Sequence, residues 1–424
     1  MTVDKVFCTM PWMEVHINAD GSYMTCGDQP NRSTGTDFAA KHNILRMSVQ
    51  EWVNSQHQKS ARYDKAAGIP NSLCNQCYQE DAVGSESKRI RENSKSGISP
   101  VNFYKTFAAS KDQAHFDYSL QNAGETTYKP ISYHISLGNE CNLSCKMCVP
   151  WASSKVAAQW KQQGQWVGPI RLNWTDDNTR WQELLDTMCN TEDLQFVHVI
   201  GGEPMLNPKF EQLADSLIAA GRTNIYFGFT TNGTILNIPL VEKLKAFRHV
   251  EIGISIECVG ELNDYVRQGC NTDQVLANIE EYAKHRSESH VYVTIRPVPS
   301  ALSVHRLDDL YRWCIDRKLD VLTNFLANPP FLQIRNLPHD VKTRLLVQYR
   351  HWVPAEPSSD SKNANPRDPT WFREHIDNEI KAIITALELP EDPQLTKQLY
   401  EKLSLWHWLD HEEIAKYFES IDYT

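Results

Sequence analysis

The sequence predicts an α/β fold in which six parallel strands, each followed by a helix, form a partial (β/α)6 barrel. Stretches rich in β-branched and aromatic residues recur along residues 129–330, and segments of helical period separate them. Strand and helix alternation of this kind is typical of a parallel sheet with right-handed crossovers. Six units are too few to close an eight-stranded barrel. The strands are expected at 132–138, 195–200, 224–231, 250–257, 291–296 and 320–325.

Three of these strands have one apolar and one polar face. In the strand at 250–257, Ile252, Ile254 and Ile256 alternate with small or polar residues, and the strands at 224–231 and 291–296 alternate in the same way. A sheet covered by helices on both faces would be apolar on both. The polar face therefore indicates a polar ligand near the carboxyl ends of the strands. His134 and Arg296 are the candidate substrate contacts, although His134 could be a hydrogen-bonded core residue.

Three cysteines follow the first predicted strand in the run Cys141-Asn-Leu-Ser-Cys145-Lys-Met-Cys148. Three thiolates can hold three irons of a [4Fe–4S] cluster and leave the fourth iron open to another ligand. The alternatives are a zinc site that lacks one ligand, or three core cysteines.

This spacing resembles the signature of the radical SAM superfamily. The resemblance implies a partial barrel of the radical SAM type, with S-adenosylmethionine bound to the open iron. Gly201-Gly202-Glu203 follows the second strand and matches the family segment that binds the amino group of this cofactor. Two glycines allow close backbone approach, and a carboxylate accepts hydrogen bonds from an ammonium group. The resemblance implies further cofactor contacts from Met147, Thr231, Asn232, Ser255, Glu257 and Arg267.

A second cysteine set lies near the N-terminus, at Cys8, Cys26, Cys74 and Cys77. Asp20-Gly21 predicts a hairpin turn that brings Cys8 and Cys26 together, and Cys74 and Cys77 form a CxxC pair. Four thiolates can complete either a zinc site or a [4Fe–4S] cluster. The pattern resembles the twitch domain, a shortened SPASM domain that holds an auxiliary cluster. Twitch domains usually follow the barrel, whereas this segment precedes it.

These patterns predict three domains. Residues 1–100 form the α+β twitch-like domain, 101–128 a linker, 129–330 the barrel, and 331–424 a helical extension with an exposed linker at 354–369. Helical periods are expected at 371–388, 394–408 and 411–420, with an apolar surface rich in tryptophan. The basic stretch at 88–91 is interpreted as a solvated helix face.

Composition narrows the functional class. The chain has 424 residues, eleven cysteines and a formal net charge of −10. The negative charge argues against nucleic acid as a partner. Residues 1–14 do not resemble a signal peptide, and no apolar run predicts a membrane span. Free thiols and metal chemistry are therefore favoured over disulfides, and we expect a cytoplasmic protein.

The resemblance implies an oxidoreductase or modifying enzyme that cleaves S-adenosylmethionine reductively to a 5′-deoxyadenosyl radical. The radical abstracts hydrogen from a small polar molecule, such as a sugar or cyclitol, or from a peptide side chain. The auxiliary [4Fe–4S] cluster would accept an electron, and flavodoxin or ferredoxin would supply the reductant. Cys258 and Cys270 are candidate hydrogen donors, with inert loop cysteines as the alternative. A zinc-bearing binding or scaffold protein on a degenerate barrel is the alternative function.

Overall fold

The computed structural model describes residues 6–27, 36–82, 87–94, 112–287, 290–353 and 369–406. The chain divides into two compact units. The first consists of Met1–Glu140, Lys161–Phe229 and Glu242–His249, and the second of Cys141–Trp160, Thr230–Val241 and Val250–Thr424. Both units take residues from distant parts of the sequence.

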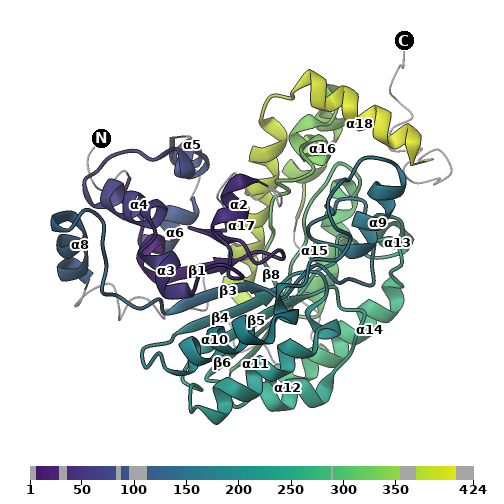
Figure 1. The fold of residues 1–424 in the computed structure, drawn as a ribbon. Coiled ribbons are helices and arrows are strands. Elements are labelled where there is room, and N and C mark those ends of the chain that lie inside the picture. Colours follow the sequence, from purple (N-terminus) through teal and green to yellow (C-terminus); the bar gives the residue numbers. More distant parts are fainter. Residues whose placement is uncertain are drawn as a thin grey trace. The chain divides into compact units, whose positions relative to one another are not determined.

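The strands have the order β2-β1-β3-β4-β5-β6-β7-β8 (Figure 1). The pairs β1–β3, β3–β4, β4–β5, β6–β7 and β7–β8 are parallel, and the hairpin pair β1–β2 is antiparallel. This order confirms the predicted α/β class. The strands are β1 (Glu14–Ile17), β2 (Tyr23–Met24), β3 (Ser132–Ser136), β4 (Phe196–Ile200), β5 (Tyr226–Thr231), β6 (His249–Ile254), β7 (Val291–Ile295) and β8 (Asp320–Val321).

All six predicted strands are present, with one marked difference in length. The last strand was expected over 320–325, but β8 contains only Asp320–Val321. Leu322, the next apolar residue, is exposed. The hydrophobic pattern therefore overestimated the strand, because it does not reveal where pairing to β7 ends.

The N-terminal hairpin extends the parallel sheet of the first unit. Gly21 has φ +81° at the predicted turn, and the hairpin pairs β1 with β2. Sequence analysis predicted residues 1–100 as a separate domain, whereas β1 pairs with β3 from Glu14↔Ser132 to Ile17↔Ile135. The four residues of β1 are all buried, which a strand at the free edge of a small domain would not require.

Helices of the first unit bury their apolar faces against the sheet. In α11 (Pro208–Ala219), Phe210, Leu213 and Leu217 are each at most 1% exposed, as their spacing predicted. Phe210 contacts Phe229 of β5 with ring centroids 5.0 Å apart. Burying each such side chain stabilises the fold by about 1.5–3 kcal/mol. The other helices here are α1 (Met10–Met13), α2 (Asp37–Lys41), α3 (Val49–Val53), α4 (Gln56–Ala66), α5 (Asn75–Ala82), α6 (Lys88–Ser94), α8 (Asp112–Gln121) and α10 (Asn178–Cys189).

The second unit contains the cysteine loop and the C-terminal helices. Its α15 (Leu307–Asp316) has the predicted helical period, with Leu307, Leu310 and Cys314 buried. Two predicted tail helices are present as α17 (Pro369–Glu388) and α18 (Pro393–Leu405), whereas residues 354–368 and 407–424 lie outside the described residues. The remaining helices are α9 (Ser154–Gln162), α12 (Ile238–Leu244), α13 (Glu261–Val266), α14 (Thr272–Ala283) and α16 (His339–Arg350); α9 and α12 cross a boundary between the units.

No helix in the described ranges is long and apolar enough to span a lipid bilayer.

A half-buried histidine makes the stability of the first unit depend on pH. His57 contacts the ring of Trp52 and shares a 3.0 Å hydrogen bond with Thr25. Burial, together with the nearby His42, lowers the pKa of His57 to about 4 from an ordinary 6.5. The neutral form is thus favoured in the folded state, so its stabilising effect is complete above pH 6.5 and lost as pH falls toward 4.

We expect the free energy of unfolding to fall between pH 6.5 and pH 4, with at most about 3 kcal/mol coming from His57. Urea titrations across this range should show a shallower pH dependence for His57→Gln. The exposed His351→Gln provides the control. An unchanged slope in His57→Gln would contradict this assignment.

Candidate functional site

The Cys141–Cys148 loop is irregular and is held by backbone hydrogen bonds within the second unit. The Ser144 N–H donates to the Gln268 carbonyl at 2.9 Å, and the Lys146 N–H donates to the Val266 carbonyl at 2.8 Å. The hydroxyl of Ser153 also donates to the Leu143 carbonyl at 2.9 Å. Since buried backbone groups need partners, these contacts fix a loop that has no strand or helix of its own.

Hydrogen-bond donors approach the thiols of this loop. Leu143 N–H lies 3.4 Å from Cys141 Sγ, and Asn232 Nδ2 lies 3.9 Å from the same sulfur. Arg267 Nη1 lies 4.0 Å from Cys145 Sγ. Such donors and a guanidinium favour the thiolate form, which is the form that binds iron.

Burial has the opposite effect on the thiols. Burial raises the pKa of Cys145 to about 11, although Arg267 lowers it. Burial also raises the pKa of Cys148, and the neighbouring Cys145 and Cys141 raise it further. A metal centre would therefore have to release protons from these thiols as it binds. The set of three thiols with adjacent donors fits an iron–sulfur cluster.

Glu257 and Arg267 form a buried ion pair beside the cysteine loop. Arg267 Nη2 lies 2.6 Å from Glu257 Oε1, and the Glu257 side chain is 0% exposed. Glu257 Oε2 accepts the Val298 N–H at 2.6 Å. Burial raises the pKa of Glu257, against the opposing effect of Arg267. Burial lowers the pKa of Arg267, but the nearby carboxylate and Cys145 thiol raise it above its ordinary value. Arg267 therefore remains a cation.

The amide of Asn232 connects the end of β5 to the cysteine loop. Its Nδ2 donates to Asn142 Oδ1 at 2.8 Å, and its Oδ1 accepts from the Thr234 hydroxyl at 2.6 Å. The Ser255 N–H donates to the Thr231 carbonyl at 2.9 Å, joining the ends of β5 and β6. Met147, in the cysteine loop itself, is buried. The second unit thus contains most of the predicted cluster and cofactor residues: Cys141, Cys145, Met147, Cys148, Thr231, Asn232, Ser255, Glu257 and Arg267.

Gly201-Gly202-Glu203 makes a close backbone approach in the first unit. Gly201 and Gly202 have φ of +99° and +48°. A Cβ on Gly202 would lie 2.0 Å from the Glu140 carbonyl oxygen, and that oxygen accepts the Glu203 N–H at 2.7 Å. Glu203 is 1% exposed and its carboxylate accepts the Met205 N–H. The segment is thus packed against the residues that directly precede Cys141.

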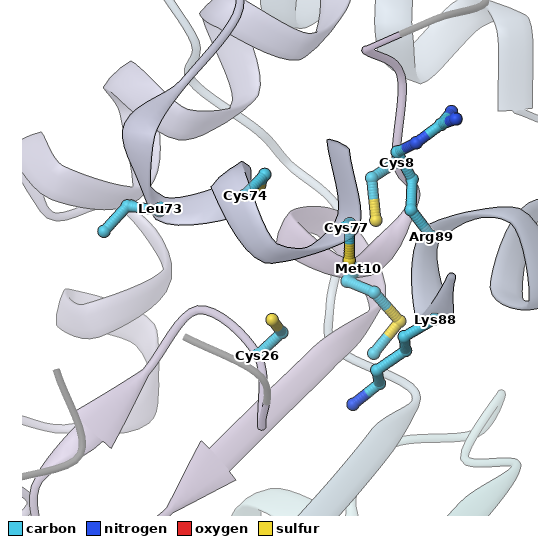
Figure 2. Close-up of a pocket in the computed structure, with 8 residues that line it drawn as sticks. All are labelled: Cys8, Met10, Cys26, Leu73, Cys74, Cys77, Lys88 and Arg89. Atoms are coloured by element: carbon cyan, nitrogen blue, oxygen red, sulfur yellow. The ribbon is translucent and has the colours of Figure 1, made fainter. Parts of the chain in front are cut away.

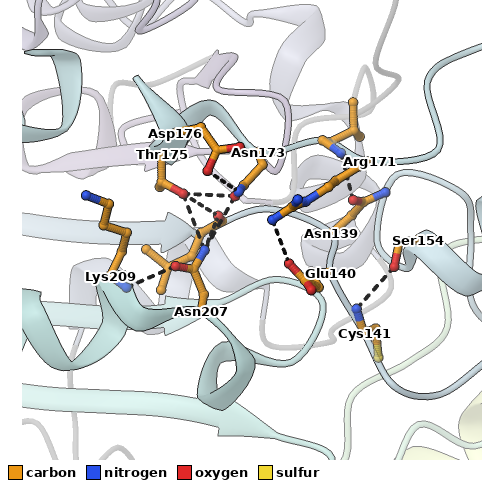
Figure 3. A network of polar contacts seen from close by, with 12 residues as sticks. Asn139, Glu140, Cys141, Ser154, Arg171, Asn173, Thr175, Asp176, Asn207 and Lys209 are labelled. Carbon is orange, nitrogen blue, oxygen red and sulfur yellow. Dashed lines mark hydrogen bonds and ion pairs between the residues drawn. The ribbon is translucent and has the colours of Figure 1, made fainter. Parts of the chain in front are cut away.

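A polar network holds the backbone leading to Cys141 (Figure 3). Asn207 Nδ2 donates to the Leu137 carbonyl at 2.9 Å, and Asn139 Nδ2 donates to the Ile170 carbonyl at 2.9 Å. Arg171 pairs with Glu140 at 3.0 Å. In the second unit, Asn263 Oδ1 accepts the Glu257 N–H at 3.0 Å. The sequence analysis did not identify three of these supporting residues: Glu140, Asn207 and Asn263. They act through backbone groups, which carry no motif.

The predicted substrate residues have different surroundings. Arg296 pairs with Glu251 at 2.6 Å and occupies the space beside Gly253. The ring of His134 is stacked between His16 and His198, with centroids 4.7 and 5.1 Å apart. These three histidines are in register on β1, β3 and β4. The alternation along β4 could have identified His198, whereas His16 required knowledge that β1 joins this sheet.

The two candidate hydrogen-donating cysteines also differ in accessibility. Cys258 is 0% exposed. Cys270 is half-buried, and its sulfur lies 3.8 Å from Asn263 Nδ2. Burial raises the pKa of Cys270, while Arg267 lowers it. Of the two, Cys270 has the more accessible thiol.

The four N-terminal cysteines line one pocket, which encloses about 340 Å³ including its opening (Figure 2). They come from three stretches of the chain: the turn before α1, the segment after β2, and the junction of a short 3-10 helix (Ser72–Cys74) with α5. The basic residues Lys88 and Arg89 line the pocket too, together with Met10 and Leu73. Their stretch was predicted as a solvated helix face, which is wrong for Arg89: it is 7% exposed and pairs with Asp81. Asp81 lies in α5 and Arg89 in α6, so the three- and four-residue spacing within one helix could not predict this pair.

Buried charge also surrounds this pocket. Lys65 is 1% exposed and donates to the Tyr78 hydroxyl at 2.6 Å. Burial acts to lower its pKa, but Cys74 and Tyr78 more than compensate and raise it. Burial raises the pKa of the Cys8 thiol, with further contributions from Cys26 and Cys74.

Among the described residues, no three Cys, His, Asp or Glu side chains are placed to hold one metal ion. A zinc ion requires sulfurs about 2.3 Å from a common centre. A cubane cluster instead binds its sulfurs at separate irons.

Residues 135–310 match the sequence model of the Radical SAM superfamily. An uncharacterized protein of Methanocaldococcus jannaschii is 27% identical over 135 residues, which are 31% of this chain and 40% of that protein. The mycofactocin maturase MftC of Mycobacterium ulcerans is 24% identical over 181 residues, 42% of this chain and 43% of that protein. The chain thus spans about two-fifths of the length of these curated relatives.

Solved structures show weaker similarity. Native anSMEcpe with bound AdoMet is 18% identical, with a TM-score of 0.40 over 53% of this chain and 60% of that chain. Streptococcus suis SuiB bound to S-adenosylmethionine is 16% identical, with a TM-score of 0.35 over 71% of this chain and 65% of that chain. The family match covers less than half of this chain and shows similarity to the Radical SAM superfamily over residues 135–310.

The close approach at Gly202 gives a test of the site's construction. Gly202→Ala should lower the free energy of unfolding by about 3 kcal/mol or more, because the added Cβ meets backbone. Gly221→Ala is the control, since Gly221 also has positive φ but has open space around it. Its cost should be only about 1–2 kcal/mol. Equal losses in urea unfolding would show that contact with Glu140 is not the constraint.

Proposed function

Starting from the radical SAM domain, we propose that this chain cleaves S-adenosylmethionine reductively and oxidises or modifies a substrate carbon. The observation that carries the proposal is the loop of three thiols beside the Glu257–Arg267 pair. Cys141, Cys145 and Cys148 would hold a [4Fe–4S] cluster with one iron lacking a protein ligand. With S-adenosylmethionine bound, this centre supplies a 5′-deoxyadenosyl radical that abstracts hydrogen from the substrate.

The remaining residues of the site would bind and orient the cofactor. Glu203 would accept hydrogen bonds from the amino group, while Gly201 and Gly202 let the backbone approach it. Arg267 would attract the carboxylate, and Met147 would pack on the adenine. Thr231, Asn232, Ser255 and Glu257 would contact the ribose and methionine groups. The short polar contacts around Asn232 and Glu257 support this role because they hold both side chains in place.

We further propose that Cys8, Cys26, Cys74 and Cys77 hold an auxiliary [4Fe–4S] cluster. Their shared pocket supports this assignment. Four thiolates leave no open iron, so substrate would not bind there without displacing a ligand. The proposed role is to accept the electron that leaves the substrate radical. The positive charge retained by Lys65 would favour the reduced state of such a centre.

The substrate is proposed as either a peptide side chain or a small polar molecule such as a sugar or cyclitol. The name of the relative MftC, a mycofactocin maturase, favours action on a precursor. The polar strand faces of this chain suit either substrate. His134 and Arg296 remain the proposed substrate contacts, and Cys270 is a better candidate than the fully buried Cys258 for donating hydrogen. A flavodoxin or ferredoxin is the proposed electron donor.

The three-thiol loop is tested by replacing one ligand. Cys145→Ala should abolish formation of 5′-deoxyadenosine from S-adenosylmethionine and dithionite, because the site then offers only two thiolates. Cys189→Ala is a matched control, since this half-buried helical cysteine donates to the Ser216 carbonyl. Quantifying 5′-deoxyadenosine by chromatography is the measurement. Full activity in Cys145→Ala, or none in the cluster-loaded wild type, would contradict the proposal.

The auxiliary cluster predicts a specific metal content. Anaerobically reconstituted protein should contain about eight irons and eight sulfides per chain, and Cys74→Ala/Cys77→Ala should retain about four of each. The double variant should still cleave S-adenosylmethionine but lose product that requires substrate oxidation. Zinc without sulfide in the wild type would instead favour a non-catalytic scaffold protein.

A further inference from the structure

The C-terminal helix α18 reaches the cysteine loop through the side chain of Lys146. The ammonium nitrogen of Lys146 lies 4.4 Å from the ring centroid of Tyr265 and 5.4 Å from that of Trp406. Trp406 is the C-terminal cap residue of α18. Both rings are within the distance at which a cation is attracted to an aromatic face.

A second contact joins the same helix to α9. Lys402 Nζ lies 5.9 Å from the ring centroid of Trp160. Residues 141–160 belong to the same compact unit as α18. The helix therefore contacts the segment once between its cysteines and once near its end.

Trp406 is itself firmly placed. The backbone N–H of Trp406 donates to the Lys402 carbonyl at 3.0 Å and to the Leu403 carbonyl at 3.1 Å. Its ring centroid lies 6.1 Å from that of the buried Phe331. Leu399 and Leu403, on the buried side of α18, are 0% exposed. The aromatic ring can therefore hold the lysine in one place.

Lys146 carries a positive charge next to a proposed ligand of the cluster. The residue follows Cys145 directly, and its N–H is bonded to the Val266 carbonyl. Because Lys146 directly follows a proposed ligand, the length of its side chain keeps the ammonium within roughly one Debye length, about 10 Å at 0.1 M salt, of the Cys145 backbone. An added electron makes a cluster more negative, so a nearby cation stabilises the reduced state and raises the reduction potential.

We propose that α18 acts as a clamp on the cysteine loop, with Trp406 and Tyr265 holding the Lys146 ammonium where it raises the reduction potential of the adjacent cluster. Lys146 and Trp406 are positioning residues in this assignment, because neither needs to contact cofactor or substrate. The inference rests on the proposed cluster at Cys141, Cys145 and Cys148, and it gives the C-terminal helices a role in the chemistry of the loop.

The test is a double-mutant cycle read by the midpoint potential of the cluster, measured by redox titration with electron paramagnetic resonance. A Cys74→Ala/Cys77→Ala background removes the auxiliary signal. Lys146→Met should lower the potential, and Lys146→Arg should restore it because the charge and its ring contacts are kept. Trp406→Leu should lower it by a smaller amount, and Trp406→Phe should recover part of the loss. In the Lys146→Met background, Trp406→Leu should cause no further shift.

A matched control is Trp352→Leu. Trp352 faces Arg312 in a comparable contact, with the guanidinium 5.4 Å from the ring centroid, but it is not part of the clamp. Its replacement should leave the potential unchanged. An unaltered potential in Lys146→Met, or an equal shift for Trp406→Leu with and without Lys146, would overturn the proposal.

A second readout does not depend on the cluster. Hydrogen exchange of the amides at 143–148 in the full-length apoprotein should be about two- to fivefold faster in Trp406→Leu than in the wild type. In Trp406→Phe the increase should be smaller. Unchanged exchange in both variants would refute the clamp. Absence of any iron in wild-type protein would refute the proposed function, while the exchange rates would still decide whether α18 holds the loop.

Discussion

The buried pair of Glu257 and Arg267 is the interaction on which the cysteine site depends. Both charges are nearly inaccessible to water, and each needs the other because an isolated buried charge is very costly. Breaking such a pair by removing one partner typically costs about 3–5 kcal/mol. Here the pair also joins three parts of the second unit: the end of β6, the residues after α13, and the Val298 N–H. Arg267 then reaches Cys145 from a fixed position.

A second constraint is steric and lies in the first unit. Gly201 and Gly202 have positive φ, and their missing side chains allow contact with Ser136, Gly138 and Glu140. The polar network around Asn139 and Asn207 fixes the same backbone from the other side. These contacts hold the backbone up to Glu140, whereas the cysteine loop itself contains no regular secondary structure.

The sequence was informative where chemistry or periodicity is local. The six strands followed from residue type, α11 and α15 followed from helical spacing, and the cysteine and glycine motifs were visible as short runs. It was less informative about pairing over long distances. The joining of β1 to β3, the early end of β8 and the burial of Arg89 depend on residues far away in the chain. Lys146 gave no signal of its own, because a lysine between two cysteines looks solvent-exposed until Tyr265 and Trp406 are located.

The two cysteine sets are surrounded by positive charge in different ways, and this difference bears on their proposed roles. At the three-thiol loop, Arg267 is paired with Glu257, so part of its charge is already balanced. A second cation there is Lys146, which is held against two aromatic rings. At the four-thiol pocket, Lys65 is almost fully buried with a neutral hydroxyl and the Cys74 thiol as neighbours. A buried ammonium is costly unless negative charge lies nearby. Thiolates in the pocket would provide that charge, and an additional electron would be attracted more strongly still. The buried ammonium therefore supports the proposed electron acceptance by a cluster held at Cys8, Cys26, Cys74 and Cys77.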